Sequence, residues 1–99
     1  MNDPMLAIRK LKELLKQAAG AESDLAKAST YSAARWLIED LQAESDKDSL
    51  RLSMEIEEVR WAFGALLGFD IDNGRGVQSF FTQGLGGLQK LEQRFRKVE

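Results

Sequence analysis

The residue types that most often carry out enzymatic chemistry are missing from this chain. Its 99 residues include no histidine and no cysteine. Imidazole acid–base catalysis, thiol nucleophiles, disulfides and the usual zinc sites are therefore excluded. Catalysis would depend on carboxylates, lysine, serine or tyrosine alone. We expect a protein that is not an enzyme and that needs no cofactor.

Neighbouring carboxylates are the first residues that could still do acid–base chemistry. Glu39 is followed by Asp40, and Glu55 lies close to Glu57 and Glu58. An acid–base pair needs a shared cleft that displaces the pKa of one carboxyl from that of the other. Nothing in the sequence places two of these side chains in such a cleft. We expect them on the water-facing sides of helices.

Asp70, Asp72 and Asn73 precede Gly74 and invite comparison with a calcium loop. An EF-hand needs oxygen ligands at positions 1, 3 and 5, glycine at position 6 and an acid at position 12. Counting from Asp70 puts Gly74 at the fifth position and Phe81 at the twelfth. This register fails, so the segment predicts a tight turn and no metal site.

A glycine-rich stretch, Thr82–Lys90, resembles the approach to a phosphate-binding helix. It lacks the spacing of a phosphate-binding loop, and no clear strand precedes it. We interpret it as a connector that lets two helical pieces pack closely, with a bend or break near Gly84–Gly87.

Composition indicates one globular domain over residues 1–99, with 43% hydrophobic and 30% charged residues. No apolar run approaches the roughly 20 residues of a membrane span, and we expect a cytoplasmic protein. Charge is uneven along the chain. Residues 21–60 hold ten acids and five bases, a net charge of −5, whereas both ends are slightly basic.

Apolar spacing and helix-capping residues predict an all-α bundle of about four helices. The expected helices cover residues 4–19, 24–43, 49–67 and 77–97. Asp3 before Pro4 is a strong helix start, Ser23 or Asp24 can cap the second helix, and Gly20 and Gly68 are suited to follow helix ends.

The segment 49–67 is apolar on two sides. Its front stripe contains Leu52, Ile56, Val59, Phe63 and Leu66, and a second stripe lies about 180° away, at 100° per residue. Tryptophan and methionine are enriched in interface cores. The expected partner-binding residues are Trp61, Met54, Leu50, Ala65, Gly64 and, off the inner stripe of the preceding helix, Trp36. The alternative is a central helix that the chain's own helices cover on both sides.

These features favour a small helical interaction module that dimerises or docks on a protein partner. The sequence identifies neither that partner nor the stoichiometry.

A second hypothesis follows from Leu50–Ile56, which alternates apolar and polar residues as a half-buried strand does. A strand there, a helix over 57–67 and another from Val77 would resemble a ribbon-helix-helix protein. The resemblance covers fewer than half of the residues and implies paired strands in the major groove of DNA. Side chains projecting toward the bases would then be Arg51, Ser53 and Glu55. The acidic surroundings disfavour a nucleic-acid partner.

Overall fold

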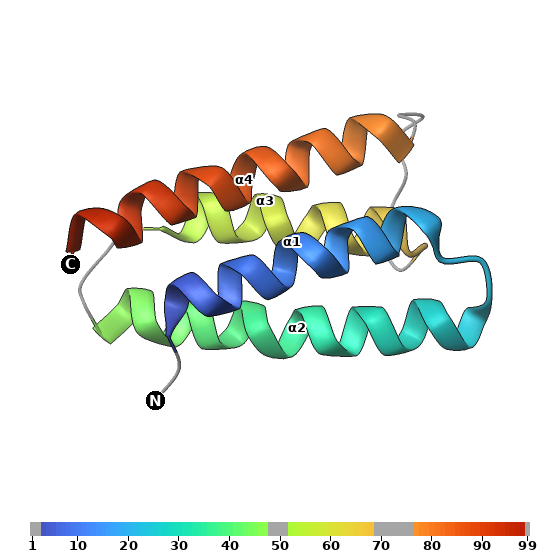
Figure 1. Ribbon diagram of the computed structural model, residues 1–99, viewed down its shortest axis with the longest axis horizontal. Coiled ribbons are helices and arrows are strands. Elements are labelled where there is room, and N and C mark those ends of the chain that lie inside the picture. Colours follow the sequence, from blue (N-terminus) through green and yellow to red (C-terminus); the bar gives the residue numbers. More distant parts are fainter. Residues whose placement is uncertain (1–2, 48–51, 69–76, 99) are drawn as a thin grey trace.

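The computed structural model describes residues 3–47, 52–68 and 77–98, and at 77, 97 and 98 only the backbone. These residues form α1 (Pro4–Gly20), α2 (Asp24–Lys47), α3 (Ser53–Leu66) and α4 (Val77–Val98). No strand occurs among them. The predicted all-α bundle is confirmed, and the helices alternate in direction along its length (Figure 1).

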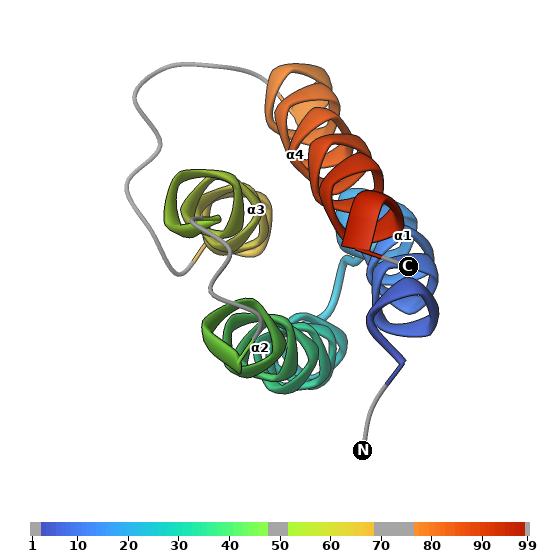
Figure 2. The same cartoon turned by 90° about the vertical axis from the view of Figure 1, so that its left-hand side faces the viewer.

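The helices form a ring in which each packs mainly on two neighbours, in the order α1, α2, α3, α4 and back to α1, and a smaller contact joins α1 to α3 (Figure 2). The outer surface between α1 and α2 therefore lies on the opposite side from that between α3 and α4. All four helices contribute to one apolar core. Its large, almost fully buried side chains include Ile8, Leu11, Leu15, Ile38, Leu41, Ile56, Phe63, Leu88, Leu91 and Phe95.

Several predicted helix ends are confirmed by hydrogen bonds. The carboxylate of Asp3 accepts from the Met5 N–H at 3.0 Å, and Ser23 Oγ accepts from the Ala26 N–H at 3.1 Å. Gly68 takes a left-handed φ of 80°, and its N–H donates to the Ala65 carbonyl at 3.3 Å. Gly20 differs from prediction because it is the last residue of α1, without a positive φ.

Two boundaries also differ from prediction. Helix α2 continues four residues beyond Ala43 to Lys47. Ser45 in this last turn is fully buried, and Gln42 donates to Asp46 at 3.0 Å, so tertiary packing and a local hydrogen bond carry the helix through a polar stretch. Helix α3 begins at Ser53, with the predicted start at Ser49 outside the described residues.

The strand alternative is wrong for the described part of its segment. Leu52 is the N-cap residue of α3, and residues 53–56 are helical. The Ile56 N–H donates to the Leu52 carbonyl at 3.0 Å, which is the helical pattern. Leu50 and Arg51, like the turn predicted around Asp70–Gly74, lie outside the described residues.

Helix α4 runs without interruption through its glycines, so the predicted break near Gly84–Gly87 is wrong. Gly84 and Gly87 are buried against other helices. A Cβ at Gly87 would lie 2.9 Å from Val59 Cγ2, and one at Gly84 would lie 3.0 Å from Ala62 Cβ. Close packing on α3 therefore offsets the helix-forming penalty of about 1 kcal/mol per glycine. Residues 82–90 are helix interior, with no helix N-terminus to hold a phosphate.

Candidate interaction surfaces

Large apolar side chains that face water identify the candidate surfaces, because the bundle core is already filled. Met54 and Leu25 are each 78% exposed, Trp36 is 71% exposed and Leu6 is 42% exposed. Single exposed apolar residues are ordinary on protein surfaces. Clusters around a tryptophan are more informative, since aromatic and methionine side chains are enriched in interface cores.

The rear of α3 is only partly open. Met54 projects into solvent, whereas Trp61 and Ala65 are half-buried and Gly64 is buried. The Trp61 ring packs edge-on against Phe80 of α4, with centroids 5.0 Å apart and planes at 78°. The chain's own α4 thus covers part of this face, as in the central-helix alternative, and leaves the Met54 end uncovered.

A shallow groove of about 410 Å³ lies between α3 and α4 beside the exposed Met54. Its lining residues are Ser53, Met54, Glu57, Glu58, Trp61 and Gln83. The groove therefore combines a methionine and an indole with two carboxylates, and this set contains no basic side chain. Such a surface suits an apolar side chain that has positive charge next to it.

Two side-chain oxygens near this groove are buried without a hydrogen-bond partner. They are Glu55 Oε2 and Gln83 Oε1. Because neither atom is accessible, a docked molecule could not reach it without displacing neighbours. These oxygens are a local energetic cost of packing α3 on α4 and not a binding handle. Glu55 therefore does not project outward as the ribbon-helix-helix hypothesis requires.

A second open surface lies on the opposite side of the bundle, between α1 and α2. Trp36 borders a hollow of about 440 Å³ there, with Leu14, Leu37 and Ala33 among its lining residues. Trp36 thus lies on a different face from Met54 and Trp61. Of the six residues predicted to bind a partner, Leu50 lies outside the described residues, and the other five do not form one site.

Three of the glutamates on α2 and α3 form ion pairs near the surface. Glu57 contacts Arg60, Glu58 Oε2 lies 3.7 Å from Lys90 Nζ, and Glu39 Oε1 lies 3.6 Å from Arg35 Nε. Within residues 3–47, 52–68 and 77–98, no three acidic side chains come together in a way that could hold a metal ion. In the same residues, no helix is both long and apolar enough to span a membrane.

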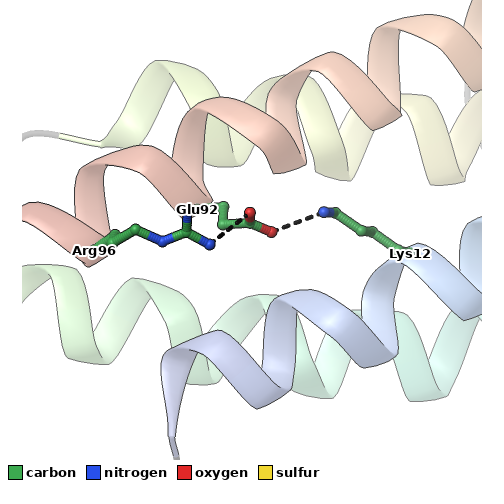
Figure 3. Close-up of polar contacts among 3 residues, drawn as sticks. All are labelled: Lys12, Glu92 and Arg96. Atoms are coloured by element: carbon green, nitrogen blue, oxygen red, sulfur yellow. Dashed lines mark hydrogen bonds and ion pairs between the residues drawn. The ribbon is translucent and has the colours of Figure 1, made fainter.

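A charged contact between α1 and α4 perturbs one carboxyl group. Lys12 Nζ donates to Glu92 Oε2 at 2.7 Å, and Arg96 donates to Glu92 Oε1 at 3.0 Å (Figure 3). The hydrogen bond from Lys12 is the main cause that lowers the pKa of Glu92. Desolvation opposes this shift, and the positive charges of Lys12, Arg96 and Arg9 support it. The contact joins the first helix to the last.

The substitution Glu92→Gln should lower the free energy of unfolding at neutral pH by about 0.5–1 kcal/mol, as for a half-exposed ion pair. Because the pKa of Glu92 is lower in the folded state, its stabilisation is complete above the unfolded pKa of about 4.3. It is lost as the pH falls through the folded pKa. Urea unfolding at a series of pH values should show the wild type and E92Q converging as the pH falls through the lowered, folded-state pKa of Glu92.

Glu13→Gln is the matched control for this measurement. Glu13 and Lys16 are 3.8 Å apart and both are about two-thirds exposed, so removing that pair should change stability little at any pH. A constant difference between wild type and E92Q across the acid range would contradict the assigned role of the Glu92 charge.

Comparison with known proteins adds no template for these surfaces: no protein-family model, curated protein or solved structure matches this chain. Leu25 is the more exposed of two apolar residues, with Leu6, that sequence reasoning overlooked. It lies 11 residues before Trp36, which returns it to nearly the same side of α2 at 100° per residue. That spacing was the available signal.

Proposed function

We propose that this protein is a small, non-catalytic interaction module that binds another protein through the groove between α3 and α4. The observation that carries the proposal is the 78% exposure of Met54 beside a half-buried indole, in a bundle whose core is filled without it. Methionine adapts its shape to a partner, and tryptophan supplies a rigid anchor.

The groove also indicates the chemistry of its partner. Glu57 and Glu58 line it, each paired with a basic residue of this chain, Arg60 and Lys90, which a partner's lysine or arginine would share or displace. A helix that presents an apolar residue flanked by lysine or arginine would satisfy both features, as in helix-in-groove recognition. Charge complementarity of this kind mainly sets specificity and association rate, while the apolar anchor supplies affinity.

The alternative of a ribbon-helix-helix regulator has no comparable support. Residues 53–56 are helical and so cannot form the ribbon that would enter a DNA groove. The described residues around Met54 are also acidic, which opposes binding to phosphates. We therefore favour a protein partner.

A photoreactive benzophenone side chain placed at position 54 tests the proposal in cells that make the protein. We expect discrete cross-linked products from position 54 and none from the matched control position Gln89, which is exposed on α4 and does not line the groove. The partner identified in this way should then bind the purified protein directly. Met54→Ser should weaken that binding by about tenfold, since loss of one apolar anchor costs upward of 1 kcal/mol.

The same products from positions 54 and 89, or unchanged affinity of M54S for the purified partner, would overturn the proposal. Because Met54 is 78% exposed, M54S should fold as the wild type does, so a loss of binding would report on the groove itself.

A further inference from the structure

The outward side of α2 carries a second, separate apolar surface. Leu25, Ser29, Ser32 and Trp36 follow one another at spacings of four, three and four residues, which keeps them on one side of the helix. We call these four residues the α2 seam. It lies opposite the side of α2 that faces the core, where Thr30, Ala34, Ile38 and Leu41 are buried. Its two large residues are 78% and 71% exposed.

The α2 seam has no charged residue, although 30% of the chain is charged. The positions beside it, Ala26, Ala28 and Ala33, are exposed alanines. The absence of charge and the exposed tryptophan are typical of an interface core, whereas serine and alanine are depleted there and contribute here only by allowing close approach. Serines and alanines around it would let another helix approach at the short end of the 8–10 Å range of axis separations.

The order of residue sizes along the seam points to its occupant. We propose that the α2 seam binds the α2 seam of a second copy of this chain, in antiparallel orientation about a two-fold axis. Such an axis between residues 30 and 31 pairs Leu25 with the partner's Trp36, and Ser29 with the partner's Ser32. Large residues at both ends and small residues in the middle make the surface complementary to itself, as a two-fold interface requires.

The hollow beside Trp36 gives the partner's leucine a place to pack. This hollow of about 440 Å³ is bordered by Leu14 and Leu37 as well as by the indole, and by Lys10, Glu13 and Gln17 on its α1 side. In the antiparallel arrangement, Leu25 of the second copy comes opposite Trp36 and can enter the hollow. The two-fold axis repeats this contact at the other end of the seam, so that each dimer has two such anchors.

The size of the seam sets the strength that we expect. At 24 residues α2 is about 36 Å long, and two such helices with the adjoining edge of α1 would bury on the order of 1,000 Å² in total. That area is at the lower limit for a specific interface. We expect a weak dimer with a dissociation constant on the order of micromolar, which forms and dissociates as the protein concentration changes.

Electrostatics gives the dimer a recognisable salt response. The seam is uncharged, and beyond its ends the two-fold axis brings Glu22 of one copy near Glu39 of the other. Arg35, 3.6 Å from Glu39, offsets part of that repulsion. Added salt should therefore leave the dimer unchanged or strengthen it, whereas attraction between opposite charges would weaken.

This inference goes beyond the proposed function because it uses a different face of the bundle. The groove at Met54 lies between α3 and α4, on the side opposite the hollow at Trp36. Variants at position 54 and at position 36 therefore test the two ideas separately, and either can fail while the other holds.

Sedimentation equilibrium of the full chain over a range of concentrations tests the dimer. We expect a monomer–dimer equilibrium for the wild type and dissociation constants at least about 30-fold higher for Trp36→Ala and Leu25→Ser. Met54→Ser is the matched control, since it removes a side chain as exposed as Leu25 from another face, and it should dimerise as the wild type does. Circular dichroism should show that all three variants remain folded.

A wild type that stays monomeric up to about 100-fold above micromolar concentration, or a dimer weakened by M54S and not by W36A, would overturn the proposal.

Oxidative cross-linking tests the orientation in a chain that has no native cysteine. A mixture of S29C and S32C should form disulfide-linked dimers. L25C alone should not, because the two copies of position 25 lie about 16 Å apart along an antiparallel pair. Rapid linkage of L25C to itself would indicate a parallel pair and refute the arrangement.

Discussion

Replacing Gly87 by alanine is expected to lower the free energy of unfolding by about 2 kcal/mol, although alanine is the better helix former. The new Cβ would lie 2.9 Å from Val59 Cγ2 and 3.4 Å from the Glu55 carbonyl oxygen. Val59 is buried, and its β-branched side chain has little rotamer freedom. Relief therefore requires α4 to move away from α3, which opens the core along their contact.

Gly86→Ala is the matched control in the same helix. No atom lies within 4 Å of a Cβ built there, so the substitution should raise stability by up to about 1 kcal/mol through helix propensity. Gly84→Ala should also destabilise, because Ala62 Cβ and Leu15 Cδ1 both lie 3.0 Å from the new carbon. Urea unfolding of the three variants measures these effects. Equal gains in stability at all three positions would show that α4 does not pack this closely.

The glycines show where sequence reasoning reaches its limit. Local propensity correctly marks Gly84, Gly86 and Gly87 as unfavourable in a helix, and it therefore predicted a break. What decides the outcome is the separation between α4 and α3, which depends on residues distant in sequence such as Val59 and Ala62. The amino-acid sequence of one protein, taken alone, does not give the distance between these two helices.

The helices themselves could be predicted because their signals are local. Asp3 with Pro4, and Ser23 before Asp24, specify helix starts through single side chains. Gly68 specifies an end because its φ of 80° is unfavourable for residues with a Cβ. By contrast, the last turn of α2 depends on the burial of Ser45, which only the assembled bundle supplies.

The candidate site could be predicted only in part for a related reason. Helical spacing correctly placed Trp36 away from the inner side of its helix, and it is 71% exposed. The same spacing grouped Trp61, Ala65 and Met54 on one outer face of α3. The structure divides them, because Phe80 lies against Trp61 while Met54 stays open. Spacing tells which side of a helix a residue is on, but not what covers that side.

This difference in burial predicts that removing Trp61 lowers the free energy of unfolding much more than removing Trp36 does. Trp61→Ala should lower the free energy of unfolding by about 2–3 kcal/mol, somewhat less than the 3–5 kcal/mol typical of a fully buried aromatic residue. The loss comprises the buried part of the indole, its edge contact with Phe80 and the cavity left beside that buried ring. Trp36→Ala should change monomer stability by less than about 0.5 kcal/mol, as for a surface substitution.

These stabilities are measured by urea unfolding at a protein concentration low enough to keep the chain monomeric, because self-association would add to the stability of the wild type.

Fluorescence gives an independent check through the single-tryptophan variants W36F and W61F. Trp61 in W36F should emit at shorter wavelength than Trp36 in W61F, since its ring is half-buried beside Phe80. If W61A were as stable as W36A and both rings emitted as in water, the rear of α3 would be open along its length. Trp61 would then belong with Met54 as a full anchor of the groove. A loss of stability confined to W61A would instead make Trp61 the rigid wall of the groove and leave Met54 as the side chain that a partner covers.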